Sequence, residues 1–265
     1  MTEVAPTISF AGRTALVSGI GPGLGRELAL RFASAGADVV LAARTQSYLD
    51  EVAAEVDALG KVAVAVPADI TNAKDCAGIA QAALAATGRI DVVVHNAYVG
   101  LPFTRFEDAD LTQWRSMMDV NTFGALRVTQ AVLPALRVRG GSVVFINTQQ
   151  IRRVFASRGS YAISKAALFT AGQVLAKELG PDGIRVNSVV VGWMDGPPLQ
   201  GYFNSVAADG GATVAEQRAQ VESTNPLGLI PGSADAAGAA LFLASDLAAA
   251  ITGQSLDVNA GETMS

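Results

Sequence analysis

The sequence contains very little of the chemistry that several enzyme classes require. It has one histidine, His95, and one cysteine, Cys76, in 265 residues. A zinc site built on two histidines or on several cysteines is therefore excluded, and so is a disulfide within the chain. A Ser-His-Asp relay would have to use His95, which we expect to be structural, and no G-x-S-x-G turn occurs. The G-x-x-x-x-G-K-[ST] loop is also absent.

Clustered basic charge and long apolar runs are missing as well. The net charge is −5 and no block of lysine or arginine occurs, so we do not expect nucleic acid as a partner. No apolar run reaches the ~18 residues of a membrane-spanning helix, and the N-terminus lacks the pattern of a signal peptide. With a single cysteine, these absences predict a cytoplasmic protein with no membrane partner.

What the chain does contain is a regular alternation of short apolar runs and amphipathic segments. The runs predict strands at 13–19, 38–43, 61–69, 89–97, 141–148, 183–192 and 254–259. Helices are expected at 23–37, 47–60, 72–87, 111–139 with a break near Asn121, 160–180 and 234–244. This order predicts an α/β fold, a doubly wound Rossmann-type parallel sheet of about seven strands with helices on both faces.

One long segment interrupts this alternation. Residues from about 192 to 232 contain four prolines, Pro197, Pro198, Pro226 and Pro231, and many glycines. A long loop in a compact domain usually serves as a lid or a binding loop, so we expect a substrate loop here. No repeat, charge block or linker divides the chain, and residues 1–265 are expected to form one domain.

The turn after the first predicted strand is rich in glycine. It spells G-x-x-x-G-x-G on Gly19, Gly23 and Gly25, rather than G-x-G-x-x-G. In a doubly wound fold, this junction is where main-chain N–H groups and a helix N-terminus bind the pyrophosphate of a dinucleotide. An ordinary strand-to-helix loop with spare glycines is the alternative, but the position of the turn favours a dinucleotide site.

A second motif lies in "SYAISKAAL". Tyr161 and Lys165 are four residues apart on a predicted helix and therefore share one face. A nearby ammonium stabilises a phenolate, so we expect the pKa of Tyr161 to be lowered toward neutrality. A phenol with such a pKa would serve as a general acid or base.

The motifs "SGIGPGLG", "HNA", "DVNTFG" and "YAISK", in this order and spacing, resemble those of the short-chain dehydrogenase/reductase family. The resemblance implies that Tyr161 is the general acid/base, that Lys165 binds the nicotinamide ribose, and that Asn121 holds a water for proton relay. It also implies an oligomer, a homotetramer or homodimer. The cofactor-binding residues that it implies are Gly19, Gly23, Leu24, Gly25, Arg44, Asp69, Ile70, Asn96, Ala97, Tyr161, Lys165, Gly192 and Met194.

The sequence departs from the family pattern at several positions. Thr148 stands thirteen residues before Tyr161, where the family has a catalytic serine. Its hydroxyl can still donate to a substrate carbonyl, so we expect Thr148 to be catalytic in a sterically altered site. Tyr98 replaces a glycine, and Val191 and Gly196 replace a proline and a threonine that often holds the carboxamide.

The end of the second strand bears on the choice of cofactor. An acidic residue there would bind the ribose 2′-hydroxyl of NAD, but this chain has Ala43 followed by Arg44. A guanidinium suits the 2′-phosphate of NADP, although Arg44 could instead be a solvated surface charge. NADP(H) is therefore the preferred cofactor and NAD(H) the alternative.

These features together predict an oxidoreductase that moves a hydride between the nicotinamide and an apolar alcohol or ketone. Two alternatives stay open: a catalytically weak regulatory module that binds NAD(P), and an epimerase or dehydratase that retains its cofactor. Arg152 and Arg153 could meet an acidic group on a substrate but more often such residues face solvent. Candidate pocket residues are Val99, Leu101, Phe103, Phe155, Trp193, Met194, Tyr202 and Phe203.

Overall fold

A sheet of seven parallel strands runs through the centre of the protein. The computed structural model describes residues 8–100 and 103–264. The strands are β1 (Thr14–Ser18), β2 (Asp38–Ala43), β3 (Ala63–Pro67), β4 (Val92–His95), β5 (Gly141–Thr148), β6 (Ile184–Val191) and β7 (Ser255–Val258). Their spatial order is β3-β2-β1-β4-β5-β6-β7. The expected doubly wound parallel sheet is confirmed, with its switch point between β1 and β4.

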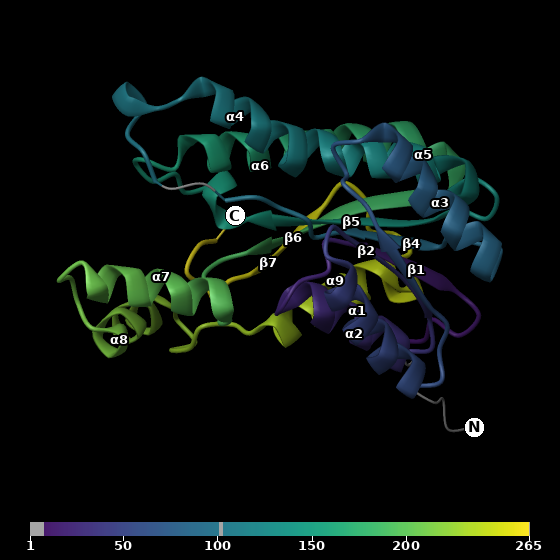
Figure 1. Ribbon diagram of the computed structural model, residues 1–265, viewed down its shortest axis with the longest axis horizontal. Coiled ribbons are helices and arrows are strands. Elements are labelled where there is room, and N and C mark those ends of the chain that lie inside the picture. Colours follow the sequence, from purple (N-terminus) through teal and green to yellow (C-terminus); the bar gives the residue numbers. More distant parts are fainter. Residues whose placement is uncertain (1–7, 101–102, 265) are drawn as a thin grey trace.

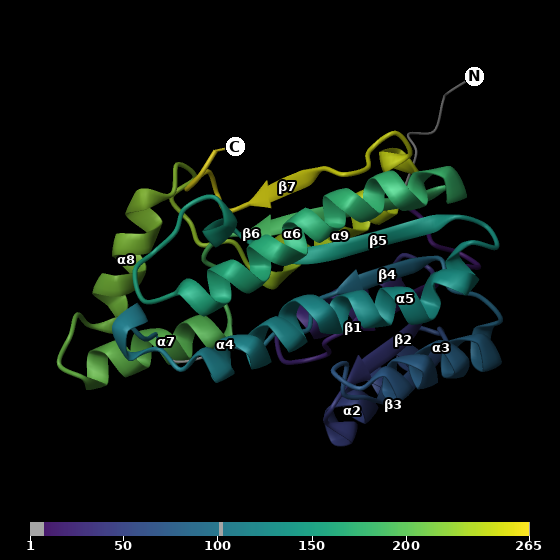
Figure 2. The same cartoon turned by 90° about the horizontal axis from the view of Figure 1, so that it is seen from above.

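Helices cover both faces of this sheet. They are α1 (Leu24–Ser34), α2 (Gln46–Ala58), α3 (Ala73–Thr87), α4 (Leu111–Met118), α5 (Ala125–Leu136), α6 (Gly159–Leu179), α7 (Pro197–Ala208), α8 (Val214–Thr224) and α9 (Ser233–Ala244). Figures 1 and 2 show α1, α2 and α9 along one face and α3, α5 and α6 along the other. No helix in the described part of the chain is both long enough and apolar enough to span a bilayer.

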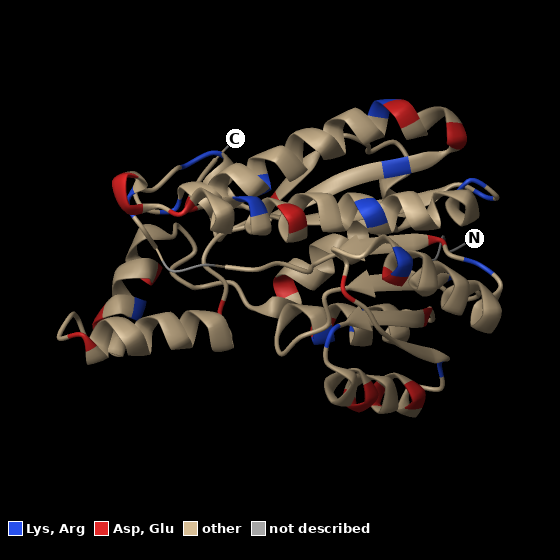
Figure 3. Cartoon of the chain, turned by 45° about the horizontal axis from the view of Figure 1, so that its top comes forward, with Lys and Arg blue, Asp and Glu red and all other residues tan. Residues whose placement is uncertain are grey.

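The core is split by the sheet into two layers of apolar side chains. One layer lies between the strands and α1, α2 and α9, and the other between the strands and α3, α5 and α6. The central strands β1 and β4 are buried along their whole length, which explains why they read as continuous apolar runs rather than as alternating ones. Lysine and arginine are interspersed with aspartate and glutamate over helices and loops (Figure 3).

The break expected in the long helical tract is present as a π-helix. It covers Asp119–Gly124 and joins α4 to α5. Thr122 donates a hydrogen bond from its hydroxyl to the main-chain oxygen of Ser164 on α6, which holds this turn against the neighbouring helix. Single π-turns within helices occur frequently at functional sites, and this one carries Asn121.

The segment expected to be a long loop is instead largely helical. Helices α7 and α8 lie within it and extend beyond the carboxyl ends of the strands (Figure 1). Pro197 and Pro198 occupy the first positions of α7, where proline is tolerated because those N–H groups have no partner within the helix. The two helices enclose a small separate cluster of apolar residues: Leu199, Phe203, Val221 and Ile230, with Trp193, Tyr202 and Val214 at its edge.

Candidate active site

The predicted site residues lie at one edge of the sheet, where the parallel strands end. Gly19 follows β1, Arg44 follows β2, Asn96 follows β4, Thr148 is the last residue of β5, and Gly192 follows β6. Ligands of doubly wound sheets bind outside the carboxyl ends of the strands, at the switch point. The topology therefore brings together residues that are far apart in the sequence.

The glycine turn packs so tightly against the end of β4 that side chains are excluded from it. A Cβ on Gly19 would lie 2.2 Å from the main-chain nitrogen of Ala97, and one on Gly25 would lie 2.3 Å from the carbonyl oxygen of Gly19. Asn96 fixes the turn by donating from Nδ2 to that same carbonyl oxygen at 2.7 Å. A Cβ on Gly21, in contrast, would have no atom within 4 Å, so packing does not require a glycine at that position.

The first helix begins at this turn without a side-chain cap. Gly23 is the N-cap residue of α1, with a φ of 107°, and the side chain of Leu24 is buried in the core. A positive φ favours glycine, and an uncapped helix N-terminus presents N–H groups and a partial positive charge to an anion. The close approach at Gly19 and Gly25 and the open helix end fit the pyrophosphate of a dinucleotide.

Two charged residues lie near the ends of β2 and β3. Arg44 is exposed and has no ion pair among the described residues, and its charge lowers the pKa of Asp69. The larger causes of that lowering are the hydrogen bonds that Asp69 accepts from the main chain and the hydroxyl of Thr71. Ile70 packs directly against Gly124, because a Cβ on Gly124 would lie only 2.6 Å from Cδ1 of Ile70. Among the described residues, Arg44 thus places an unpaired positive charge directly after β2.

Thr148 and Tyr161 meet at the end of β5. The hydroxyl of Thr148 lies close enough to the phenol of Tyr161 to lower the pKa of that phenol in part. Thr148 is buried because it ends a central strand, and Tyr161 reaches it from the first turn of α6. The ring of Tyr98 lies edge-to-face against that of Tyr161, with 6.4 Å between centroids. The residue at the family's serine position thus lies close to the residue at its tyrosine position.

The expectation that Lys165 lowers the pKa of Tyr161 is wrong for this structure. Burial raises the pKa of Tyr161 above its ordinary value, and Tyr98 raises it further, whereas the hydroxyl of Thr148 and the charge of Arg158 lower it in part. Burial also lowers the pKa of Lys165 to about 8. The physical reason is that both groups are removed from water, which raises the cost of charging each one.

Lys165 lies on α6 with its amine against β5. It is 3% exposed, and its Nζ donates to the carbonyl oxygen of Ile146 at 2.9 Å. A buried ammonium with one main-chain partner retains two further donors, which suits a residue that binds hydroxyl groups of a ligand. The spacing of four residues places Lys165 one helical turn after Tyr161 on α6.

Asn121 is fully buried and its side chain is held on three sides. Its Oδ1 accepts from the main-chain nitrogen of Val99 at 2.7 Å, while Nδ2 donates to the oxygen of Val99 at 3.1 Å and to Oγ of Ser164 at 3.1 Å. The hydroxyl of Ser164 in turn donates to the main-chain oxygen of Tyr161. Asn121 therefore connects the segment after β4 to the helix that carries Tyr161 and Lys165.

His95 has a structural environment. It is 3% exposed, stacks on Phe145 with 5.1 Å between ring centroids, and its Nε2 hydrogen-bonds Oγ1 of Thr129 at 2.8 Å. Burial lowers the pKa of His95 to about 3, and the charge of Lys165 adds to the effect. A neutral imidazole locked between a ring and a threonine agrees with a structural residue.

The residues after β6 enclose the far side of the site. A Cβ on Gly192 would lie 2.8 Å from Cβ of Asn259, so this position also requires close packing. Met194 packs against the core layer beneath α1 and α9. Asp195 forms an ion pair with Arg218 of α8 at 2.8 Å, and Gly196 starts α7. This ion pair fixes the base of the helical segment to the body.

Several of the candidate pocket residues gather around one side chain, and others do not. Phe103, Phe155, Trp193 and Tyr202 all surround Arg158, a residue that sequence reasoning missed. Phe203 is buried and belongs to the cluster under α7. Leu101 lies outside the described residues. The sequence does contain an indication of the position of Arg158, because this residue lies three residues, or about one helical turn, before Tyr161.

The comparison with known proteins extends over nearly the whole chain. A family model described as enoyl-(acyl carrier protein) reductase matches residues 19–263. An uncharacterized oxidoreductase of Mycobacterium tuberculosis (strain CDC 1551 / Oshkosh) is 35% identical over 253 residues, which cover 95% of this chain and 92% of the relative. The 7alpha-hydroxysteroid dehydrogenase of Escherichia coli (strain K12) is 32% identical, over 94% of each chain.

A solved structure agrees with this one in detail. The crystal structure of carveol dehydrogenase from Mycobacterium avium in complex with NAD has a TM-score of 0.91 to this chain. The two share 28% sequence identity, and the match covers 97% of this chain and 99% of the other. The fold and the edge of the sheet that carries the site are therefore common to both proteins.

Proposed function

This chain belongs to the short-chain dehydrogenase/reductase family of oxidoreductases, and we propose that it is an NAD(P)-dependent alcohol dehydrogenase or ketoreductase. The observation that carries this proposal is the placement of three groups at one edge of the sheet: Thr148 ends β5, Tyr161 lies in the first turn of α6, and the buried Lys165 follows one turn later with its Nζ against β5. A hydroxyl and a phenol that face each other at the end of a strand can together hold one substrate oxygen.

Each residue of this group has a proposed role. Tyr161 transfers a proton to or from the substrate oxygen, and its raised pKa keeps the phenol protonated at neutral pH, ready to donate to a ketone. Thr148 donates a hydrogen bond to the same oxygen and fixes its position. Lys165 binds the nucleotide sugar, and Asn121 holds the π-helix and α6 in register.

The nucleotide fits the glycine turn described above. We assign its pyrophosphate to the N-terminus of α1 at Gly23, Leu24 and Gly25, and its adenosine to the side of Asp69, Ile70, Asn96 and Ala97. Gly192 and Met194 are assigned to the nicotinamide side. When bound, the nicotinamide would give or accept the hydride at the carbinol carbon, chemistry that belongs to the cofactor rather than to the protein.

NADP(H) is proposed as the preferred cofactor. Arg44 is exposed at the end of β2 and has no carboxylate partner among the described residues, so its guanidinium is available to a 2′-phosphate. The carveol dehydrogenase with the matching fold is bound to NAD, which makes NAD(H) the alternative to be tested.

The proposed substrate is a mainly apolar alcohol or ketone. The aromatic residues that follow β4, β5 and β6 support this proposal, because rings packed side by side form a surface suited to a flat or cyclic body. Helices α7 and α8 are proposed as the lid over this surface. The steroid and carveol dehydrogenases among the relatives are named for cyclic alcohols.

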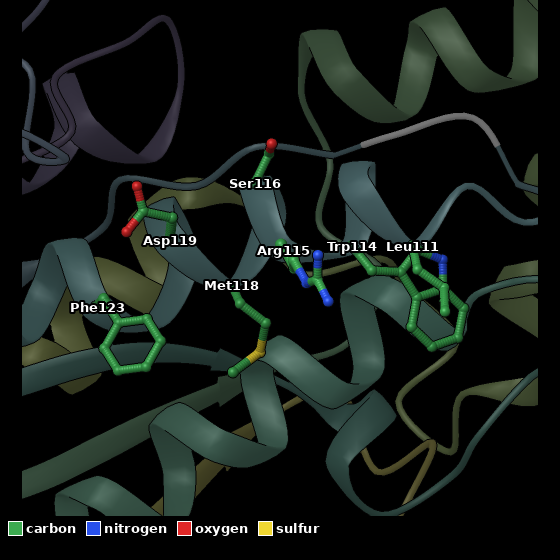
Figure 4. A pocket seen from close by; sticks show the side chains of 7 residues that line it. All are labelled: Leu111, Trp114, Arg115, Ser116, Met118, Asp119 and Phe123. Atoms are coloured by element: carbon green, nitrogen blue, oxygen red, sulfur yellow. The ribbon is translucent and has the colours of Figure 1, made fainter.

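A homo-oligomer, tetramer or dimer, is also proposed. An open hollow of about 670 Å³ lies on α4 and the π-helix, lined by Leu111, Trp114, Arg115, Ser116, Met118, Asp119 and Phe123 (Figure 4). Leu111 and Phe123 are about half exposed there, and exposed apolar side chains around a hollow are typical of contact surfaces. Light scattering of the purified protein tests this proposal. The cytoplasmic location stays a prediction.

A substrate panel tests the proposed activity. The purified protein is incubated with cyclic and acyclic alcohols, ketones and an enoyl thioester, separately with each nicotinamide cofactor, and the absorbance of the reduced nicotinamide is followed. We expect turnover of an alcohol–ketone pair, faster with NADP(H). Tight nucleotide binding with no turnover of any compound would contradict the proposal and favour the regulatory module, and retention of nucleotide with no net reduction would favour an epimerase or dehydratase.

A further inference from the structure

Arg158 differs from every other arginine of the chain in its surroundings. Most of the others form ion pairs, and Arg185 donates to main-chain carbonyls. Arg44, Arg115 and Arg139 lack such a partner but are exposed. Arg158 is half-buried, and its side chain has neither a carboxylate nor a carbonyl partner among the described residues.

Four aromatic rings surround its guanidinium. The central carbon of that group lies 3.9 Å from the ring centroid of Phe103, 5.6 Å from Trp193, 5.7 Å from Phe155 and 5.8 Å from Tyr202. We call these four rings and Arg158 the arginine cage. Attraction by ring faces compensates part of the hydration that the guanidinium has lost, but it satisfies none of its five N–H donors.

The cage lies beside the proposed catalytic tyrosine. Arg158 is the residue directly before α6, about one turn from Tyr161, and its charge acts on the Tyr161 phenol. The rings come from the segments that follow β4, β5 and β6, so they belong to the same edge of the sheet as the reacting groups. Phe103 is 51% exposed, which leaves the cage open to a ligand.

Arg158 has no ion pair among the described residues, unlike the two arginines that precede it. The two arginines considered from the sequence as contacts for an acidic substrate are both engaged: Arg152 pairs with Asp257 at 3.0 Å, and Arg153 pairs with Glu262 at 3.4 Å. Of the three arginines between β5 and α6, Arg158 is the one without a carboxylate partner among the described residues. A planar anion can accept two parallel hydrogen bonds from a guanidinium, which the rings cannot provide.

We propose that Arg158 binds a carboxylate on the substrate, and that the arginine cage selects alcohols or ketones with a flat or cyclic apolar body and an acidic group. This inference rests on the proposed function and names the substrate class of the same site. The body of the substrate packs against Trp193 and Tyr202, the carboxylate meets the guanidinium, and the reacting oxygen reaches Tyr161.

Binding rather than turnover tests the inference first. Cyclohexanecarboxylate, benzoate and 1-naphthoate are titrated calorimetrically into the nucleotide-bound protein beside their carboxamides, which have the same shape without the charge. We expect at least one acid to bind 10- to 100-fold tighter than its amide, the range for a hydrogen-bonded charge. Equal affinities for acids and amides, or no binding of any acid, would overturn the inference.

Variants then assign the preference to Arg158. In Arg158→Gln the acid should bind about 10- to 100-fold more weakly while the amide changes little. Arg158→Lys keeps the charge and guards against a folding defect; it should retain part of the preference, because an ammonium cannot form the paired hydrogen bonds. Arg139→Gln is the control and should behave as the wild type. Arg139 is exposed and lies just before the start of β5, whereas the site lies after the end of that strand. A preference that persists in Arg158→Gln, or an equal loss for acid and amide, would show that Arg158 only joins the lid to the body.

Turnover separates this inference from the proposed function. Hydroxycyclohexanecarboxylates and their amides are offered as substrates with each cofactor. If acids bind through Arg158 but neither type is turned over, the acidic site stands and the proposed activity fails. If amides and acids are turned over with the same KM, the activity stands and the inference about Arg158 fails.

Discussion

Lys165→Met tests, in the protein without its cofactor, whether the amine of Lys165 is buried as the proposed site requires. The measured quantity is the free energy of unfolding as a function of pH. Lys165 is buried against β5, and burial lowers its pKa from 10.5 to about 8. Below pH 8 the amine is charged in both the folded and the unfolded protein and contributes no pH dependence. Between pH 8 and 10.5 the unfolded chain holds a proton that the folded chain has released. The free energy of unfolding therefore rises with pH in this window.

The size of the effect follows from the shift. One bound proton corresponds to about 1.4 kcal/mol per pH unit, and the full shift to about 3 kcal/mol. Urea unfolding followed by circular dichroism at pH 7, 8, 9 and 10 would measure it as the difference between the wild type and Lys165→Met, because the tyrosines of the unfolded chain, which begin to titrate near pH 10, contribute equally to both proteins. Lys165→Met removes the group, so the wild type should gain stability relative to this variant as the pH rises from 8.

Lys177→Met is the matched control. Lys177 lies on the same helix and is exposed, so its removal should leave the pH dependence parallel to that of the wild type. Parallel curves for the wild type and Lys165→Met across pH 8 to 10 would refute the reasoning, since they would mean that the lysine keeps its ordinary pKa in the folded protein.

Three further predictions concern the glycine turn, Thr148 and Arg44. Gly25→Ala places a Cβ 2.3 Å from the Gly19 carbonyl oxygen and should weaken nucleotide binding at least about 10-fold, whereas Gly21→Ala should leave it unchanged. Equal affinities of the two variants in a fluorescence titration would count against the glycine turn as the pyrophosphate site. Thr148→Ser should keep turnover within about 3-fold, and Thr148→Val should lose about 100-fold; similar rates for both would make the hydroxyl irrelevant. Arg44→Ala should raise the KM for NADPH about 10-fold and leave the KM for NADH unchanged; a change in neither would make Arg44 a surface charge.

Much of the fold could be predicted because the strands and most helices carry strong local signals. The expected bounds of β1 to β7 agree with the structure within three residues. The π-helix at Asn121 was expected only as a break, since its geometry depends on contacts with Ser164 on a distant helix. Parallel strand ends then bring the predicted site residues to one edge without further information.

Three features could not be predicted, each for an identifiable physical reason. Pro197 and Pro198 indicate a loop when considered alone, but at the start of a helix they cost nothing, and α7 and α8 are stabilised by an apolar cluster that forms only in three dimensions. The raised pKa of Tyr161 depends on burial, which the spacing from Lys165 does not reveal. The environment of Arg158 likewise comes from three segments that are far apart in the sequence, those that follow β4, β5 and β6.

The central claim is that the Tyr161 phenol transfers the proton while the nucleotide is held elsewhere. Tyr161→Phe removes only the hydroxyl, so nucleotide affinity and single-turnover rate should be measured together on this variant and on the wild type. The account predicts an affinity within about 2-fold and a rate lower by about 100- to 10,000-fold, the usual contribution of a general acid or base. A Tyr161→Phe variant that turns over at the wild-type rate would contradict it.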